Sequence, residues 1–137
     1  AIFEGAESNK SITASLYDLA SVDEANMINI LEESDGIIIG TPTINADAPK
    51  PVWDLLSSMM YIEKRGKTGG SFGSFGWSGE APDMIIERMK ALHFRVPPID
   101  PMKIKLIPTK KEIEDCFDYG VEFAEIVNGK MIEMTMN

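Results

Sequence analysis

The sequence predicts an α/β domain built on an open parallel sheet in three layers, with helices on both faces. Stretches of helical periodicity alternate with short apolar or glycine-rich segments along most of the chain. Residues 36–41 (Gly-Ile-Ile-Ile-Gly-Thr) show no polar alternation, which is typical of a central parallel strand covered on both faces. Strands that are separated by helices join through right-handed crossovers, and this arrangement makes the sheet parallel.

Length and charge limit the classes of function. The 137 residues suffice for one domain, which we place at residues 1–128, followed by a tail or linker stump at residues 129–137. The net charge of -9 disfavours nucleic acid and anionic membranes as partners. It favours either a partner with a basic patch or plain solubility. No apolar run approaches the roughly 20 residues of a membrane span. The single cysteine, Cys116, excludes an internal disulfide and fits a cytoplasmic protein.

The first half of the chain contains two predicted helices and two predicted strands. Residues 1–9 resemble the last turns of a helix that begins before the chain does. Residues 11–18 alternate apolar and polar side chains, which predicts a strand near a sheet edge. Ser21 and Glu24 form a capping box, so a helix is expected from there to about Glu33. The apolar strand at residues 36–41 follows.

The second half continues the alternation. A helix is predicted from Pro51 to about Arg65, followed by a glycine-rich strand at residues 67–74 and a helix at residues 81–92. Prolines break the last strand into residues 94–96 and 102–107. A second capping box, at residues 109–112, starts the closing helix, which Gly129 is expected to stop. Its predicted inward face consists of Ile113, Cys116, Phe117, Gly120, Ala124 and Val127.

Two unusual loops follow predicted parallel strands. Residues 41–51 contain three prolines, and residues 74–80 place Phe75 and Trp77 one residue apart among glycines. In open α/β sheets, ligands bind at the carboxyl ends of the strands. Glycines permit close backbone approach and the two aromatic rings offer flat faces, so the second loop suits a planar aromatic ligand. The alternative is a tight turn whose aromatic side chains only cap the core.

No catalytic or metal-binding set is predicted. His93 is the only histidine, and a histidine near a helix end is most often structural. Cys116 faces the core in the predicted helix, which argues against a reactive thiol. The glycines at residues 66–73 fit neither the P-loop nor the dinucleotide fingerprint. An aromatic site without an acid, base or nucleophile is expected to bind a cofactor that supplies its own chemistry.

The two loops also carry a resemblance to a known family. The run at residues 37–45, the Pro51-Val52 pair and the run at residues 72–81, in this order and spacing, resemble the flavodoxin-like domain of flavodiiron proteins, or A-type flavoproteins. The resemblance extends over residues 1–128. It implies a flavodoxin-like fold that binds FMN and passes electrons from a redox protein donor to a diiron domain, which reduces oxygen or nitric oxide. No diiron domain is encoded in these residues, so we do not expect turnover by this chain alone.

The resemblance implies which residues would contact the FMN. Those of the first loop are Pro42, Thr43, Ile44 and Asn45. Those of the second loop are Ser74, Phe75, Gly76, Trp77, Ser78 and Gly79. Ile44 stands where such domains frequently have an aromatic side chain, which weakens the expected stacking on that side.

The family's first strand and its Ser/Thr-rich phosphate loop have no counterpart in the sequence. In the strand order 2-1-3-4-5, this strand would lie between residues 11–18 and residues 36–41. We therefore expect an N-terminal truncation, with FMN bound more weakly than by a version that includes the missing strand and loop.

Two other functions stay open at this stage. One is a stand-alone FMN-dependent reductase of a quinone or another small substrate. The other is a flavodoxin-like scaffold that binds no flavin and serves protein interaction. Assembly into a homo-oligomer is also open. Bound FMN would colour the protein yellow, which distinguishes the flavin-free scaffold from the others.

Overall fold

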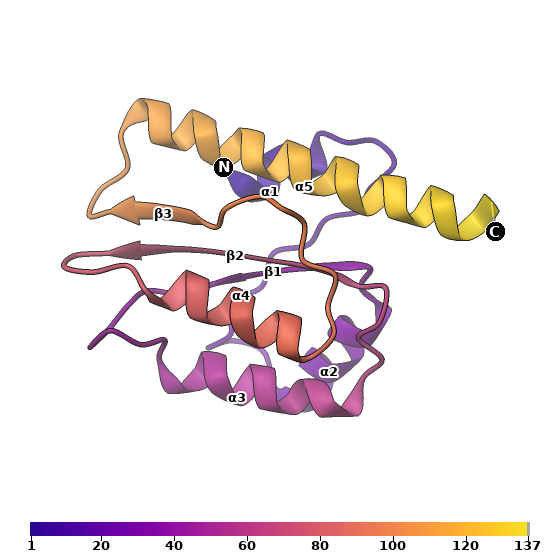
Figure 1. Ribbon diagram of the computed structural model, residues 1–137, viewed down its shortest axis with the longest axis horizontal. Coiled ribbons are helices and arrows are strands. Elements are labelled where there is room, and N and C mark those ends of the chain that lie inside the picture. The colour runs from indigo at the N-terminus through magenta and orange to yellow at the C-terminus, as the bar shows by residue number, and fades with distance from the viewer. Residues whose placement is uncertain (137) are drawn as a thin grey trace. The chain divides into compact units, whose positions relative to one another are not determined.

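The computed structural model describes the backbone of residues 1–136 and the side chains of residues 1–130. It divides into two compact units, one of residues 17–106 and one of residues 1–16 with residues 107–136. Figure 1 shows the helices and strands along the chain. The unit of residues 17–106 contains the sheet and both of the predicted ligand loops.

The sheet consists of three parallel strands in the order β1-β2-β3. Their bounds are Gly36–Gly40 for β1, Thr68–Phe75 for β2 and Met102–Lys105 for β3. β2 is therefore the central strand. Gly36 lies opposite Thr68, and Phe72 lies opposite Met102, so the three strands point their carboxyl ends the same way.

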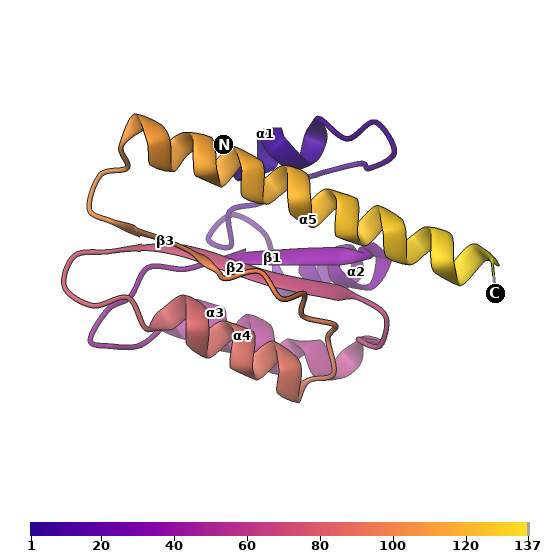
Figure 2. The same ribbon diagram turned by 45° about the horizontal axis from the view of Figure 1, so that its top comes forward.

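Helices connect the strands within this unit. α2 (Glu24–Glu33) precedes β1, α3 (Lys50–Ser58) with the short 3-10 helix η1 (Met59–Tyr61) joins β1 to β2, and α4 (Ala81–Ala91) joins β2 to β3. Both views show α3 and α4 along the same face of the sheet (Figures 1 and 2). The α/β class and the parallel sheet that the sequence predicts are confirmed.

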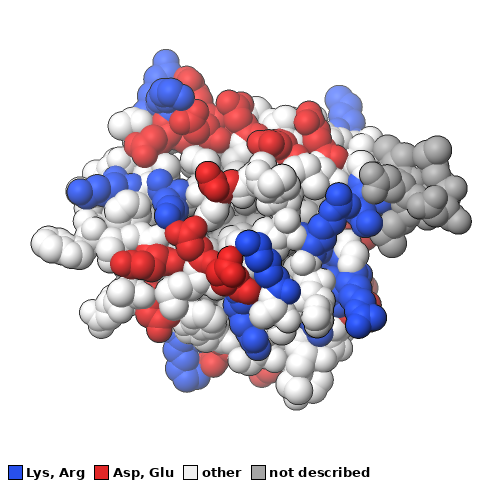
Figure 3. Space-filling model, in the orientation of Figure 1, with Lys and Arg blue, Asp and Glu red and all other residues white. Residues whose placement is uncertain are grey.

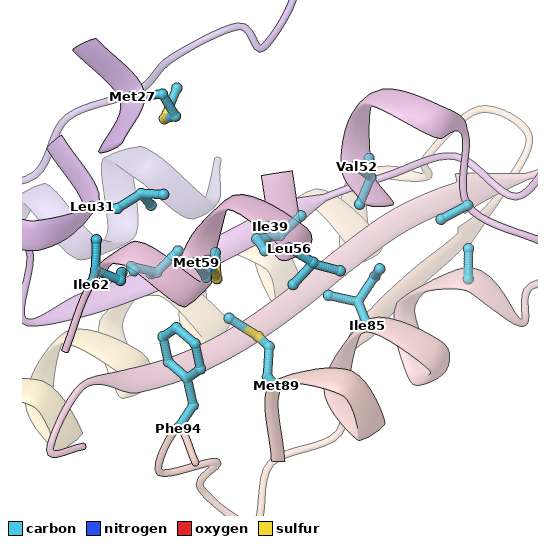
Figure 4. Close-up of a cluster of buried hydrophobic side chains, with 13 residues drawn as sticks. Met27, Leu31, Ile39, Val52, Leu56, Met59, Ile62, Ile85, Met89 and Phe94 are labelled. Atoms are coloured by element: carbon cyan, nitrogen blue, oxygen red, sulfur yellow. The ribbon is translucent and has the colours of Figure 1, made fainter. Parts of the chain in front are cut away.

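Apolar side chains fill the space between the sheet and these helices (Figure 4). Leu56 and Met59 from α3 and η1 meet Ile85 and Met89 from α4, and all four are almost completely buried. At roughly 25 cal/mol per Å² of buried apolar surface, such a cluster is the main source of stability of the unit. The other labelled members of this cluster are Met27, Leu31, Ile39, Val52, Ile62 and Phe94.

His93 follows the C-cap of α4, Leu92, and forms the turn there. Its φ of 72° is left-handed, and its N–H donates to the carbonyl of Lys90 while the Phe94 N–H donates to that of Met89. This pair of bonds defines a Schellman motif, in which residue C′ is usually glycine. The motif turns the chain so that Phe94 enters the core.

The second unit is a pair of helices, α1 (Ile2–Glu7) and α5 (Lys110–Met136). They touch through glycines: a Cβ on Gly5 would collide with the Phe117 carbonyl, and a Cβ on Gly120 with the Ile2 carbonyl. The predicted capping box at the start of α5 is confirmed, because the Thr109 N–H donates to Glu112 Oε1 and the Glu112 N–H to Thr109 Oγ1.

The predicted strand at residues 11–18 is wrong, since these residues form no strand in the structure. A strand needs a neighbour to satisfy its backbone groups, and no described residues pair with this segment. The central position predicted for residues 36–41 is also wrong within the described sheet, because β1 pairs only with β2 there and lies at the edge. Residues 94–96 contribute only a single bridge, between Thr68 and Arg95.

Several helix boundaries differ from prediction. α2 is capped by Asp23 rather than Ser21, because the Asp23 carboxylate accepts the Asn26 N–H at 3.0 Å. The helix from Pro51 narrows to 3-10 geometry at Met59 and does not reach Arg65. α5 continues through Gly129 to Met136, so the predicted stop at Gly129 is wrong. Its buried face also differs, since Ile113 is 48% exposed and Tyr119 and Phe123 are buried instead. Asn137 lies outside the described residues.

Candidate functional site

Hydrogen bonds join the two predicted loops at the carboxyl ends of β1 and β2. The Thr43 N–H donates to the Ser74 carbonyl at 3.3 Å, and Thr43 Oγ1 accepts the Ala81 N–H at 3.1 Å. Thr43 of the first loop therefore binds both the start of the second loop and the first turn of α4. These bonds hold the loops side by side.

Close backbone packing below the loops depends on Gly73. A Cβ at this position would collide with the Thr41 carbonyl, and Thr41 itself is only 3% exposed. Thr41 also donates its N–H to the Phe72 carbonyl at 3.0 Å, which extends the β1–β2 pairing to the edge of the site. The loops thus begin from fixed points of the sheet.

The two aromatic side chains of the second loop have different environments. Trp77 is 96% exposed, so its indole contacts almost nothing within the protein. Phe75 is half-buried and packs on Gly79, where a Cβ would lie 2.8 Å from Phe75 Cδ1. Phe75 therefore supports the loop from within, and Trp77 offers the free flat surface. Gly76 is open, since a Cβ there would meet only Leu106 Cδ2, at 3.7 Å.

The first loop contains a tight turn. Ile44 and Asp47 exchange both backbone hydrogen bonds, at 2.9 Å and 3.1 Å. Asn45 and Ala46 between them have φ of 52° and 59°. Positive φ at both central residues is the signature of a type I′ turn. The turn leaves Ile44 56% exposed and Asn45 exposed beside it.

The remaining predicted site residues are Pro42, Ser74 and Ser78. Pro42 and Ser74 are exposed, Ser78 is half-buried, and each lies in one of the two joined loops. The predicted site residues therefore lie on two loops that the hydrogen bonds of Thr43 join.

The structure adds three residues that sequence reasoning missed. Asp47 accepts the Trp53 Nε1–H at 3.0 Å, which connects the tight turn to α3. Leu106 follows β3 with a φ of 59°, is 65% exposed and donates its N–H to the Phe75 carbonyl at 2.8 Å. The residues at 45–47 are of types that favour turns, which is a weak signal for the turn at Asp47. Nothing in the sequence predicts a leucine with positive φ.

A hollow elsewhere on the unit does not belong to this site. It has a volume of about 610 Å³ and lies between α2 and the α3–η1 segment, lined by apolar side chains such as Met27, Leu55 and Tyr61. None of the predicted site residues lines it. Among the described residues, no helix has the length and apolarity needed to span a membrane.

Comparisons with known proteins agree with this arrangement. The sequence matches the flavodoxin family over residues 1–120. It is 39% identical over 131 residues to the type A flavoprotein fprA of Rhodobacter capsulatus, covering 95% of this chain and 30% of that protein. It is 33% identical over 112 residues to the flavo-diiron protein FprA2 of Clostridium acetobutylicum, covering 82% of this chain and 28% of that protein.

Solved structures share the fold. Rubredoxin oxygen:oxidoreductase from Desulfovibrio gigas superposes with a TM-score of 0.85 at 26% identity, covering 95% of this chain and 33% of that one. A flavodoxin from the domain Archaea superposes with a TM-score of 0.82 at 30% identity, covering 93% and 85%. The chain spans less than a third of the type A and flavo-diiron relatives just named. Its sequence, its parallel sheet and its paired loops show that the chain belongs to the flavodoxin family, with type A flavoproteins and flavodiiron proteins among its relatives.

Proposed function

We propose that this chain is an FMN-binding electron-transfer domain of the kind found in flavodiiron proteins. The single observation that carries the proposal is the indole of Trp77, 96% exposed on a loop that is hydrogen-bonded to its neighbour at the carboxyl ends of parallel strands. A large aromatic side chain gains nothing from full exposure in water, so a planar ligand accounts for its position. The family of the chain supports FMN as that ligand.

The residues present fit an isoalloxazine ring. Trp77 would stack on one face of the ring, and Ile44 would supply an apolar contact from the first loop. The open backbone at Gly76 lets the ring's polar edge approach closely, since nothing but a Leu106 methyl group lies within 4 Å of its Cβ position. Asn45, exposed on the tight turn, would hydrogen-bond the same edge. When bound, FMN supplies the one- and two-electron chemistry; the protein supplies binding, orientation and partial exclusion of water.

The electron donor and acceptor belong to the same proposal. Relatives of the chain are flavo-diiron proteins, which supports a diiron domain as acceptor and a redox protein as donor. The net charge of -9 supports a donor with a basic patch. In the unit formed by α1 and α5, Glu114, Asp118, Glu122 and Glu125 are exposed on one helix, and Figure 3 shows acidic side chains gathered over it.

Titration of the purified chain with FMN tests the proposal. Binding is expected to quench flavin fluorescence and to shift the visible flavin spectrum, as stacking on an indole does. The Trp77→Ala variant is expected to bind FMN more weakly while keeping its fold, because the Trp77 side chain contacts almost nothing in the free protein. If no change in flavin fluorescence or absorbance appears at millimolar FMN, the proposal is wrong and a flavin-free scaffold explains the fold.

A further inference from the structure

We infer that Asp47 is a positioning residue, which with Trp53 fixes the tight turn of residues 44–47 in the conformation that meets the flavin. The inference rests on the proposed function for its ligand. It concerns a hydrogen bond between a loop and a helix that the resemblance does not assign to any role.

The turn adopts a conformation that its sequence does not favour. Type I′ turns need positive φ at both central positions, which suits Asn45 but not Ala46, whose Cβ crowds the following carbonyl. Residues in such conformations persist where the surroundings hold them, and they concentrate at functional sites. The contacts that hold this turn are therefore the relevant ones.

Asp47 supplies the contact on the downstream side. Its Oδ1 accepts the Trp53 indole N–H at 3.0 Å and the Ala48 N–H at 2.8 Å. Trp53 lies in α3 and packs against the buried core, so its indole is a fixed point. The turn is thereby tied to a rigid helix.

Thr43 supplies the contact on the upstream side. It is held by the Ser74 carbonyl and by the Ala81 N–H, as described above. With Thr43 and Asp47 both fixed, the three residues between them have little conformational freedom, although none of them is buried. The hydrogen bond between Asp47 and Trp53 is exposed, so its effect is on the conformation of the exposed turn.

Four single variants of the full chain, and one double variant, test this role. Asp47→Ala and Trp53→Phe each remove one side of the hydrogen bond, and Phe keeps most of the ring packing. Asp47→Asn is the conservative variant, because its amide oxygen can still accept both N–H groups. Asp54→Asn is the matched control: it breaks the exposed Lys50–Asp54 ion pair on the same helix and touches nothing in the turn.

Two readouts are needed. The first is the dissociation constant for FMN, followed by flavin fluorescence. If the turn is no longer fixed in its binding conformation, the dissociation constant is expected to rise about five-fold in Asp47→Ala and in Trp53→Phe. It is expected to rise less than about two-fold in Asp47→Asn and Asp54→Asn. The double variant Asp47→Ala/Trp53→Phe is expected to bind no more weakly than Asp47→Ala, because Asp47→Ala already removes the bond that Trp53→Phe breaks.

The second readout does not depend on flavin. The Ile44 and Asp47 N–H groups close the turn, so their hydrogen exchange is expected to accelerate about ten-fold in Asp47→Ala and Trp53→Phe, and to stay unchanged in Asp54→Asn. In Trp53→Phe, Trp77 is the only tryptophan left, so its emission also reports FMN stacking directly.

The outcomes separate the two proposals. If the wild-type chain binds no FMN but hydrogen exchange accelerates in Asp47→Ala and Trp53→Phe, the proposed function is wrong. Asp47 then still fixes the conformation of the turn. If wild-type binds FMN and Trp53→Phe binds equally well, Asp47 does not position the turn for the ligand. A loss in Asp47→Asn as large as in Asp47→Ala would also overturn the inference, since the carboxylate charge would then be responsible.

Discussion

Substitution of Trp77 is the most direct test of the cofactor proposal. If it stacks on the isoalloxazine, Trp77→Ala removes both buried apolar area and a ring-on-ring contact. We expect the dissociation constant for FMN to rise about ten-fold, because aromatic pairs contribute roughly 0.5–1.5 kcal/mol beyond the area that they bury. The melting temperature of the free protein should not change, because the side chain is 96% exposed. An unchanged dissociation constant would remove Trp77 from the site.

Cys116 gives a prediction about pH. Burial raises the pKa of this thiol above its ordinary value, and the neighbouring Asp115 and Glu112 add to the effect. The thiolate is the reactive form, so the rate of alkylation by iodoacetamide should rise with pH around a midpoint above that of the same cysteine in urea-unfolded protein. At neutral pH the folded protein should react more slowly. Coincident midpoints in folded and unfolded protein would show that the thiol is not shielded.

At the scale of elements, α5 contains two glycines in opposite environments. Gly120 lies against the Ile2 carbonyl of α1, whereas a Cβ on Gly129 would meet nothing within 4 Å. The same substitution should therefore have opposite effects on stability at the two positions.

Gly120→Ala is expected to destabilise the protein by about 1–3 kcal/mol, because the new methyl group must push the two helix backbones apart. Gly129→Ala is expected to stabilise it by about 0.5–1 kcal/mol, the difference in helix propensity. Urea unfolding followed by far-ultraviolet circular dichroism measures both free energies. A stabilising Gly120→Ala would mean that α1 does not pack on α5 in solution.

At the scale of the whole molecule, the outer edge of β1 is the feature with the largest consequence. Among the described residues, β1 pairs only with β2. The Thr41 N–H donates to Phe72 of β2, and alternate residues of a strand direct their N–H groups to the same neighbour. The Ile39 N–H therefore points toward β2, and the Ile38 N–H points away from it.

Hydrogen exchange at these two residues tests whether the edge is open. We expect the Ile38 amide to exchange at least about ten-fold faster than the Ile39 amide, because only the second is held in the ladder. A neighbouring strand would protect both. Equal protection at Ile38 and Ile39 would show that another segment or a second copy of the chain pairs along this edge.

The sequence by itself determined the class of the fold and the location of the loops. The apolar run of β1, the glycine-rich β2 and the capping box at Thr109 are local patterns, and each kept its predicted structure. Loops at the carboxyl ends of neighbouring parallel strands are expected to lie side by side, and the hydrogen bond between Thr43 and Ser74 shows that these two do. The capping box closes within four residues, and the two strands have each other as ladder partners, so local pattern and tertiary pairing agreed in these cases.

The tertiary structure decided what depends on neighbours. Residues 11–18 have the alternation of a strand but no partner for their backbone groups, so they form none. Glycine is a residue type that often ends a helix, yet α5 continues through Gly129. Only the tertiary structure showed that Phe75 packs within its loop while Trp77 is exposed, and that the Trp53 indole N–H donates to Asp47. Contacts between separate segments leave no periodic pattern in the sequence.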